Sequence, residues 1–148
     1  MTGTLKRLAL TDMDAAALVH RAAFDHALPW LAGLHTAAED RWFFREGVFS
    51  QCEIWGAVDD KALLGVVAFR EDWIDQLYVL PHAQGHGIGT ELLSVAQSAF
   101  DRLQLWTFQR NLEARRFYER RGFVQVEETD GARNEEKEPD ARYLWVRP

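Results

Sequence analysis

The sequence contains a single cysteine, Cys52, among its 148 residues. An internal disulfide is therefore impossible, and no cysteine–histidine pair has the spacing of a zinc site. No apolar run approaches the ~18 residues that a membrane-spanning helix needs. The first residues also lack the apolar segment of a signal peptide. These absences predict a cytoplasmic protein that holds no metal and has no membrane partner.

Positive charge is also scarce. The chain carries 17 Lys and Arg residues against 23 Asp and Glu residues, a net charge of −6. No basic stripe is visible that could neutralise the phosphates of a nucleic acid. We therefore expect no nucleic-acid partner, and the acidic balance mildly favours a cationic substrate.

Internal repeats and linker-like segments are missing too. With 47% apolar residues, a chain of this length can bury a core without disulfides. We expect one domain over residues 1–148.

The spacing of apolar residues predicts alternating strands and helices. Thr36 and Glu39 form a capping box for the second helix, and Gly122 provides a left-handed stop after the last one. Strands are expected over 6–10, 52–58, 62–70, 72–79, 103–108, 123–128 and 142–146, and helices over 14–26, 36–46, 87–101 and 111–121.

The segment from Val79 to Leu93 carries the strongest functional signal. A strand ends in a proline turn, and a glycine-rich stretch then leads directly into an amphipathic helix. Gly85, Gly87 and Gly89 have no Cβ atoms to keep a ligand away from the backbone N–H groups. Because the helix N-terminus adds positive charge at the same place, this segment predicts a pyrophosphate site.

The spacing of the glycines narrows the choice of ligand. A dinucleotide fingerprint needs a glycine at its sixth position, where this chain has Thr90, and no Gly-Lys-Ser/Thr of a P-loop follows. Gln84, Gly87 and Gly89 instead match Q-x-x-G-x-G. This pattern resembles the acyl-CoA pyrophosphate loop of the GCN5-related N-acetyltransferase (GNAT) family.

A second segment resembles the other signature of that family. Residues 111–123, Asn-Leu-Glu-Ala-Arg-Arg-Phe-Tyr-Glu-Arg-Arg-Gly-Phe, match N-x-x-A-x-x-F-Y-x-x-x-G-F. The resemblance is strong over residues 73–126. It implies an α/β (α+β) fold of the acyl-CoA N-acyltransferase type, with a mixed, mostly antiparallel sheet of about seven strands flanked by helices.

The resemblance also implies acetyl-CoA as co-substrate, without a metal. The backbone of Leu77, Tyr78 and Val79 is then expected to pair with the pantetheine arm, as a peptide adds to a sheet edge. Asn111 should cap its helix and also contact the pantetheine. The side chain of His86 has two interpretations, facing a phosphate or facing solvent. The residues expected around the pyrophosphate are Gln84, Gly85, His86, Gly87, Ile88, Gly89 and Thr90.

Tyr118 is the expected catalytic acid, because the matching family tyrosine approaches the cofactor sulfur. At ordinary pKa values a phenol is too weak an acid, by about 2 kcal/mol, to protonate a thiolate fully. Tyr118 is therefore expected to act mainly by hydrogen bonding to developing negative charge. The alternative is a tyrosine that only packs in the core beside Phe117.

Asp75 is the expected general base. Strand alternation places it on the same face as Leu77, next to the thioester, while Glu71 lies at the mouth of the same strand. Trp106 closes the equivalent position on the neighbouring strand. The alternative for Asp75 is a structural carboxylate.

Acceptor recognition is expected from the first two helices, the loop between them and the polar loop before the last strand. Trp30 belongs to an aromatic- and imidazole-rich set that could hold a cationic amine by cation–π contact, and Glu71 and Asp75 are assigned to the same substrate site. Packing in the core is the competing role for these tryptophans. The acidic run over residues 135–138 has two interpretations, a solvated loop, which we favour, and a substrate clamp.

Together these features predict direct acetyl transfer from acetyl-CoA to a primary amine of a small molecule or peptide. Two alternatives remain: an acyl-CoA-binding module without catalysis, and an O-acyl or longer-acyl transferase on the same fold. Cys52 has no role in direct transfer. The acceptor is left open, as is the choice between a monomer and a homodimer.

Overall fold

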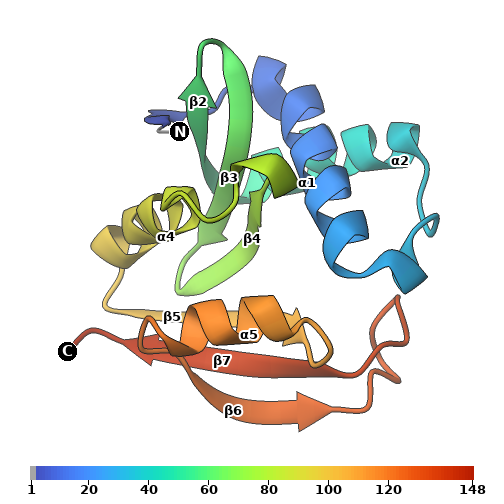
Figure 1. Ribbon diagram of the computed structural model, residues 1–148, viewed down its shortest axis with the longest axis vertical. Helices are drawn as coiled ribbons and strands as arrows, with labels where there is room; N and C mark the ends of the chain where they lie inside the picture. The colour runs from blue at the N-terminus through green and yellow to red at the C-terminus, as the bar shows by residue number, and fades with distance from the viewer. Residues whose placement is uncertain (1–2) are drawn as a thin grey trace.

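A computed structural model describes residues 3–148 and contains one seven-stranded sheet. The strand order is β1-β2-β3-β4-β5-β7-β6, and every neighbouring pair is antiparallel except β4 with β5. This confirms the predicted mixed, mostly antiparallel sheet (Figure 1). The strands are β1 Thr4–Arg7, β2 Glu53–Asp59, β3 Ala62–Arg70, β4 Trp73–Val79, β5 Arg102–Phe108, β6 Val124–Thr129 and β7 Asp140–Val146.

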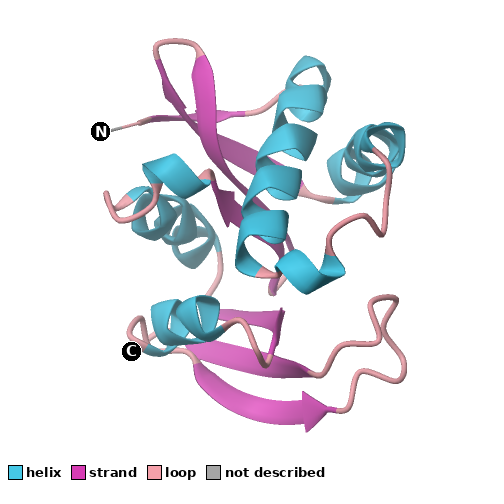
Figure 2. Cartoon of the chain, turned by 45° about the vertical axis from the view of Figure 1, so that its right-hand side comes forward, coloured by secondary structure: helices cyan, strands magenta, loops and turns pink. Residues whose placement is uncertain are grey.

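Helices cover both faces of the sheet (Figure 2). α1 (Met13–Ala27) and the helical segment over residues 37–51 pack on one face, with Met13 and Val19 in a core shared with β3. α4 (Ile88–Ala99) and α5 (Leu112–Glu119) pack on the other face, where Leu92 and Tyr118 join a second core. We call these the α1 face and the α4–α5 face.

Two predicted ends differ from the structure by more than two residues. The first strand ends at Arg7, because the Asp12 carboxylate accepts a hydrogen bond from the backbone N–H of Ala9 and a short 3-10 turn, η1 (Leu10–Asp12), forms. The second helix was expected to end near residue 46. α2 (Ala37–Trp42) instead continues through a π-helical stretch, η3 (Phe43–Val48), into α3 (Phe49–Gln51). The Thr36 capping box at its start is confirmed.

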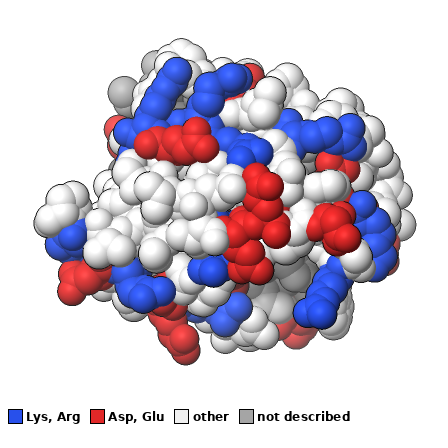
Figure 3. Space-filling model, turned by 90° about the horizontal axis from the view of Figure 1, so that it is seen from below, with Lys and Arg blue, Asp and Glu red and all other residues white. Residues whose placement is uncertain are grey.

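β6 is one edge of the sheet, and nearly all its side chains are exposed. Its charged residues Glu127 and Glu128 make the strand a poor template for pairing with another chain. On the face that carries β6, acidic side chains gather near the centre, with Lys and Arg side chains around them (Figure 3). No helix among residues 3–148 combines the length and the apolar character that a membrane span requires.

Candidate functional site

The sheet is joined across its middle by very few contacts. β4 and β5 share one registered pair, Trp73 with Gln104, and the Gln104 N–H also donates to the Asp72 carbonyl at 2.7 Å. Beyond this point, no residue of β5 pairs with positions 74–79 of β4 in the part of the chain that the structure describes. The backbone edge of β4 is therefore left without a neighbouring strand.

A cavity of about 1370 Å³ occupies the resulting split. Its walls come from both faces of the sheet: Phe24 and Leu28 from the end of α1 on one side, and Ala114, Phe117 and Tyr118 from α5 on the other. A ligand could thus enter from each face and meet a second ligand in the middle of the sheet. The cavity also takes in the glycine loop and the loop between β6 and β7, residues 130–139, which we call the late loop.

The glycine loop lines one end of the cavity as expected. Gly85 and Gly87 have positive φ angles of 80° and 87°, and Gly87 stands immediately before α4. A Cβ atom added at either position would meet nothing within 4 Å, so the space beside the backbone is open. At Gly89 a Cβ atom would lie 3.1 Å from the Phe117 ring, so this glycine also allows α5 to pack closely. Thr90 lines the same end.

Three residues predicted around the pyrophosphate do not offer a free side chain to a ligand in the cavity. Gln84 lines the cavity, but its side-chain amide donates to the Val79 carbonyl at 3.0 Å and so ties the loop to β4. The Ile88 side chain is 2% exposed and packs in the core, which leaves only its backbone for a ligand. His86 is exposed and is not among the residues that line the cavity.

Arg121 is a cavity residue that the sequence analysis missed. Its guanidinium lies 3.8 Å from the centroid of the Phe117 ring, and its Nε and Nη2 atoms donate to the Thr90 hydroxyl at 3.0 and 2.6 Å. A positive charge is thereby fixed beside the start of α4. The signal in the sequence was the spacing of Phe117 and Arg121, four residues apart on one helix.

Tyr118 is 8% exposed and lines the cavity from α5. Burial raises the pKa of its phenol, which keeps the hydroxyl protonated at neutral pH. Within residues 3–148 that hydroxyl makes no hydrogen bond to the protein. Asn111 lies at the start of the same helix, where its side chain accepts from the Ala114 N–H at 3.2 Å, which confirms the predicted cap.

The expectation that Asp75 shares a face with Leu77 is wrong. The register between β3 and β4 shifts by one residue, so Ala68 pairs with Gln76 and Phe69 with Ile74. The extra residue, Asp75, is a β-bulge that breaks the alternation of side chains. Asp75 still lines the cavity.

The partners of Asp75 lie away from the α4–α5 face. Its Oδ2 atom accepts from Arg70 Nε at 2.7 Å and lies 3.5 Å from the Sγ atom of Cys52, which packs on the α1 face. Burial, with the nearby Asp75 charge, raises the pKa of the Cys52 thiol to about 12. Cys52 is therefore a poor nucleophile at neutral pH.

The other two predicted acceptor residues, Glu71 and Trp30, do not line the cavity. Glu71 occupies the turn between β3 and β4 with a φ of 48° and borders a separate surface pocket. The Trp30 ring carries the Arg110 guanidinium 4.1 Å from its centroid, and its Nε1 donates to the Glu138 carboxylate at 3.1 Å. Its cation–π partner is thus a residue of the chain itself.

Glu138 anchors one end of the late loop. It is 4% exposed and accepts two hydrogen bonds from Arg110, both at 2.7 Å. This guanidinium lowers the pKa of the Glu138 carboxyl. Together with the bond from Trp30, the pair fastens the late loop to η2 (Pro29–Leu31), the short turn after α1.

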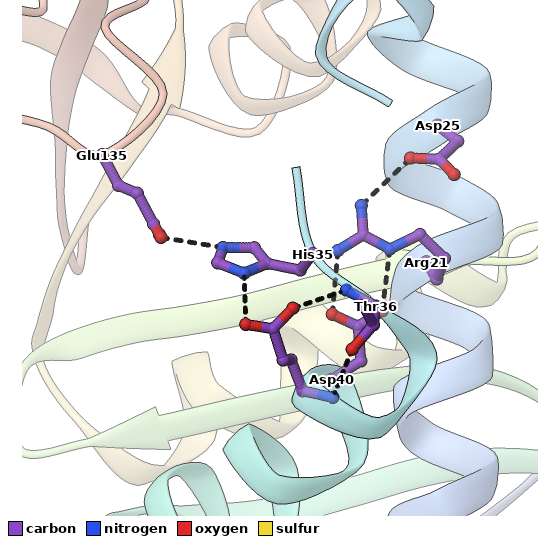
Figure 4. Close-up of polar contacts among 7 residues, drawn as sticks. Arg21, Asp25, His35, Thr36, Asp40 and Glu135 are labelled. Carbon is purple, nitrogen blue, oxygen red and sulfur yellow. Dashed lines mark hydrogen bonds and ion pairs between the residues drawn. The ribbon is translucent and has the colours of Figure 1, made fainter. Parts of the chain in front are cut away.

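His35 holds the late loop at a second point (Figure 4). Its Nε2 atom lies 2.9 Å from the Glu135 carboxylate, and its Nδ1 atom lies 3.9 Å from that of Glu39. The hydrogen bond to Glu135 raises the pKa of the His35 imidazole. The late loop is therefore tied to the segment before α2 by a bond that depends on pH.

We expect the His35 ring to titrate above the ordinary value of about 6.5 in an NMR pH titration. Because the pKa is raised, the bond stabilises the late loop in its observed position below about pH 6.5 and is lost as pH rises through the raised value. Glu135→Gln should move the midpoint back towards 6.5, and Glu46→Gln, on an exposed side chain in η3, should not. A midpoint near 6.5 in the unchanged protein would show that Glu135 does not raise the pKa of His35.

The two ends of the cavity differ in charge. The glycine end carries Arg121, whereas the wall formed by residues 127–140 is mainly acidic. Among residues 3–148, no group of three or more His, Cys, Asp or Glu side chains is arranged to hold a metal ion. This wall also carries one positively charged residue, Arg133. Its acidic residues are Glu127, Asp130, Glu136 and Asp140.

Comparison with known proteins agrees with this geometry. The family model for an acetyltransferase (GNAT) domain matches residues 50–125. The peptidyl-lysine N-acetyltransferase YiaC of Escherichia coli (strain K12) is 31% identical over 80 residues, which are 53% of this chain. The match spans about half (55%) of the length of that relative.

Solved structures share the fold along the whole chain. YjaB from Escherichia coli has a TM-score of 0.82 at 19% identity, covering 100% of both chains. A GCN5-related N-acetyltransferase from Rhodopseudomonas palustris has a TM-score of 0.76 at 17% identity, covering 99% of this chain and 96% of that one. The PaiA N-acetyltransferase from Thermoplasma acidophilum, solved with coenzyme A, has a TM-score of 0.70 at 21% identity, covering 99% of both.

Proposed function

The chain belongs to the GNAT acetyltransferase family, and we propose that it transfers an acetyl group from acetyl-CoA directly to a primary amine. The observation that carries this proposal is the cavity in the split between β4 and β5. One cavity brings together bare backbone amides, an unpaired strand edge and a buried phenol. These are the three parts needed to hold a long phosphorylated thioester and assist its cleavage.

The donor is proposed to lie along the glycine loop and β4. The amides from Gly85 to Thr90 face the diphosphate, supported by the N-terminus of α4 and by the charge of Arg121. The free edge of β4 at Leu77–Val79 takes the amides of the pantetheine arm as an added strand. Asn111 lies beside the same path.

Tyr118 is proposed to stabilise the leaving sulfur. The amine attacks the thioester carbonyl and gives up a proton as the carbon–sulfur bond breaks, so the thiolate needs a hydrogen-bond donor. Since burial raises the pKa of Tyr118, its phenol remains protonated and can donate. At unperturbed values, full transfer to the thiolate would cost about 2 kcal/mol, and burial of the phenol increases that cost. The proton that the amine loses is the one that finally neutralises the thiolate.

Asp75 is proposed as the residue that takes this proton, directly or through water. It lines the cavity in the middle of β4, next to the proposed path of the thioester. Its Oδ2 atom is already bonded to Arg70, so a proton relay would use the other oxygen or a water molecule. Trp30 and Glu71 are left out of the proposed site because neither lines the cavity.

A thiol-release assay with acetyl-CoA and a panel of amines tests the function. The panel should include small diamines, monoamines, amino acids and a lysine peptide, since the relative YiaC is named as acting on peptidyl-lysine. Turnover on any of them supports a transferase. Calorimetric binding of acetyl-CoA without turnover on a broad panel would favour a binding module instead. An absence of binding would contradict the proposed site.

Gly87→Ala is expected to weaken acetyl-CoA binding about 10-fold or more. The change strains a residue with a φ of 87° and puts a methyl group into the open space beside the loop. A lost hydrogen bond to a charged group is worth roughly 1.5–3 kcal/mol. Gly33→Ala is the matched control, because Gly33 has a φ of 86° and equally open surroundings but lies outside the cavity. Equal affinities of the two variants in calorimetry would argue against this loop as the diphosphate site.

A further inference from the structure

The late loop contains three glutamates with different surroundings. Glu135 is paired with His35, and Glu138 is buried beneath Arg110. Glu136 lies between them, is partly buried and lines the cavity. The acidic run is therefore not a uniformly solvated loop: its outer members fasten the loop, and the one between them faces the interior.

The backbone of the loop fixes the position of Glu136. The Asn134 side chain donates to the Glu138 carbonyl at 2.7 Å and accepts from the Glu138 N–H at 3.2 Å, which closes a tight turn around residues 135–137. Gly131 packs so closely that a Cβ atom there would lie 2.4 Å from the Glu138 backbone. Bonds on both sides of Glu136 therefore hold it against the cavity without any contribution from its own carboxylate.

Other acidic residues on the same wall already have partners in the protein. Glu127 accepts from Arg142 Nε at 3.0 Å, Asp130 accepts from the Ala132 N–H at 2.9 Å, and Asp140 bonds to Thr129. Glu136 has no ion pair and no side-chain hydrogen bond within residues 3–148.

The charge of Glu136 acts on another residue that lines the cavity, Tyr78. Burial raises the pKa of the Tyr78 phenol, and the negative charge of Glu136 raises it further. Tyr78 lies on β4 beside the split and lines the cavity. The carboxylate is thus placed to meet a ligand that enters from the late-loop end.

We propose that Glu136 binds a positively charged group of the acceptor other than the reacting amine, so that the enzyme selects amines with at least two positive charges. This inference rests on the proposed acetyl transfer. The reacting nitrogen must lose its proton before it attacks, and the proposed acceptor of that proton is Asp75, so the charge of this nitrogen does not last through the reaction. A second cationic group stays charged throughout and can form a lasting charge-assisted bond. The net acidic character of the wall favours such a group over a neutral one.

The test compares putrescine, a diamine, with butylamine, a monoamine of the same chain length, within the panel of amines. In the unchanged protein kcat/KM is expected to be about 10- to 100-fold higher for the diamine, the range that one charge-assisted hydrogen bond provides. Glu136→Gln should remove most of this preference by raising KM for the diamine, with little effect on kcat. Glu136→Asp keeps the charge and should retain part of the preference.

Glu46→Gln is the control, because it removes the same charge from an exposed side chain in η3, away from the cavity. It should leave the preference unchanged. Circular dichroism and the affinity for acetyl-CoA should be the same in all variants, which separates an acceptor effect from misfolding.

Three results would overturn the proposal while leaving the transferase function intact. They are a panel whose best acceptors carry one charge, a diamine preference that survives Glu136→Gln, or a fall in kcat at unchanged KM in that variant. A protein that binds acetyl-CoA but acetylates no amine would instead remove the proposed function, and this inference with it.

Discussion

Replacing Tyr118 by phenylalanine is expected to lower kcat about 100-fold while leaving the affinity for acetyl-CoA and the melting temperature nearly unchanged. The phenol is buried against Phe117 and Phe123, and its ring contacts remain in the variant. Its hydroxyl has no protein partner within residues 3–148, so its removal leaves no unsatisfied group behind. The loss should therefore fall on the chemical step and not on folding.

Tyr143→Phe provides the opposite pattern as a control. The Tyr143 hydroxyl accepts from Arg115 at 2.9 Å and donates to Glu119 at 2.7 Å, and the residue is fully buried. Its loss should destabilise the protein and leave kcat of the folded fraction close to that of the unchanged protein. Thiol-release kinetics and thermal melts on both variants give the comparison. An unchanged kcat in Tyr118→Phe would remove this residue from the mechanism.

Replacing Arg21 by leucine is expected to destabilise the fold by about 3 kcal/mol, which corresponds to a fall in Tm of roughly 10 °C. Arg21 on α1 donates to both oxygens of Asp40 on α2, at 2.8 and 2.9 Å, and also pairs with Asp25 (Figure 4). Asp40 is 6% exposed, so the variant leaves a buried carboxylate without its counter-charge.

Two further variants isolate this pair. Arg21→Leu with Asp40→Leu removes both charges and should recover most of the loss, because no unpaired ion is left buried. Arg45→Leu breaks an exposed pair with Asp14 and should cost no more than about 0.5 kcal/mol. Chemical denaturation gives each free energy of unfolding. A loss as small for Arg21→Leu as for Arg45→Leu would show that the buried pair is not stabilising.

The destabilisation should also depend on pH. The Arg21 guanidinium holds the pKa of the Asp40 carboxyl below its usual range. The stability gained from this shift is present above the unfolded pKa of about 3.9 and is lost as pH falls through the lower folded value. The difference between the unchanged protein and Arg21→Leu should therefore be full at neutral pH and shrink below about pH 4.

Local sequence signals predicted most of the fold. β3 runs over Ala62–Arg70, as its apolar run and the turn residues Asp59-Asp60-Lys61 before it predict, and Asn111 caps α5. Gly85 and Gly87 adopt the left-handed backbone that a glycine loop requires. These features depend on residues close together in the chain, so the sequence contains the information directly.

Features set by contacts between distant segments were not predictable in the same way. The bulge at Asp75 adds one residue to β4 relative to β3, and a single strand carries no pattern that marks it. The acidic run looked solvated because the partners of Glu135 and Glu138 lie about 100 and 28 residues away in sequence, at His35 and Arg110. The ring of Trp30 stacks on Arg110, and the spacing of residues in the sequence does not indicate this contact. The sequence therefore predicted, incorrectly, that Trp30 lies in the acceptor site.

The single registered pair between β4 and β5 has a consequence for the catalytic cycle. The strand edge that would hold the acyl donor is the same edge that the fold leaves uncovered at its centre. During each cycle the donor would complete the sheet as a temporary strand, and departure of the spent carrier would return those peptide groups to water. Cohesion of the two halves of the protein would thus rise and fall with occupancy, so that the substrate itself serves as a removable part of the scaffold.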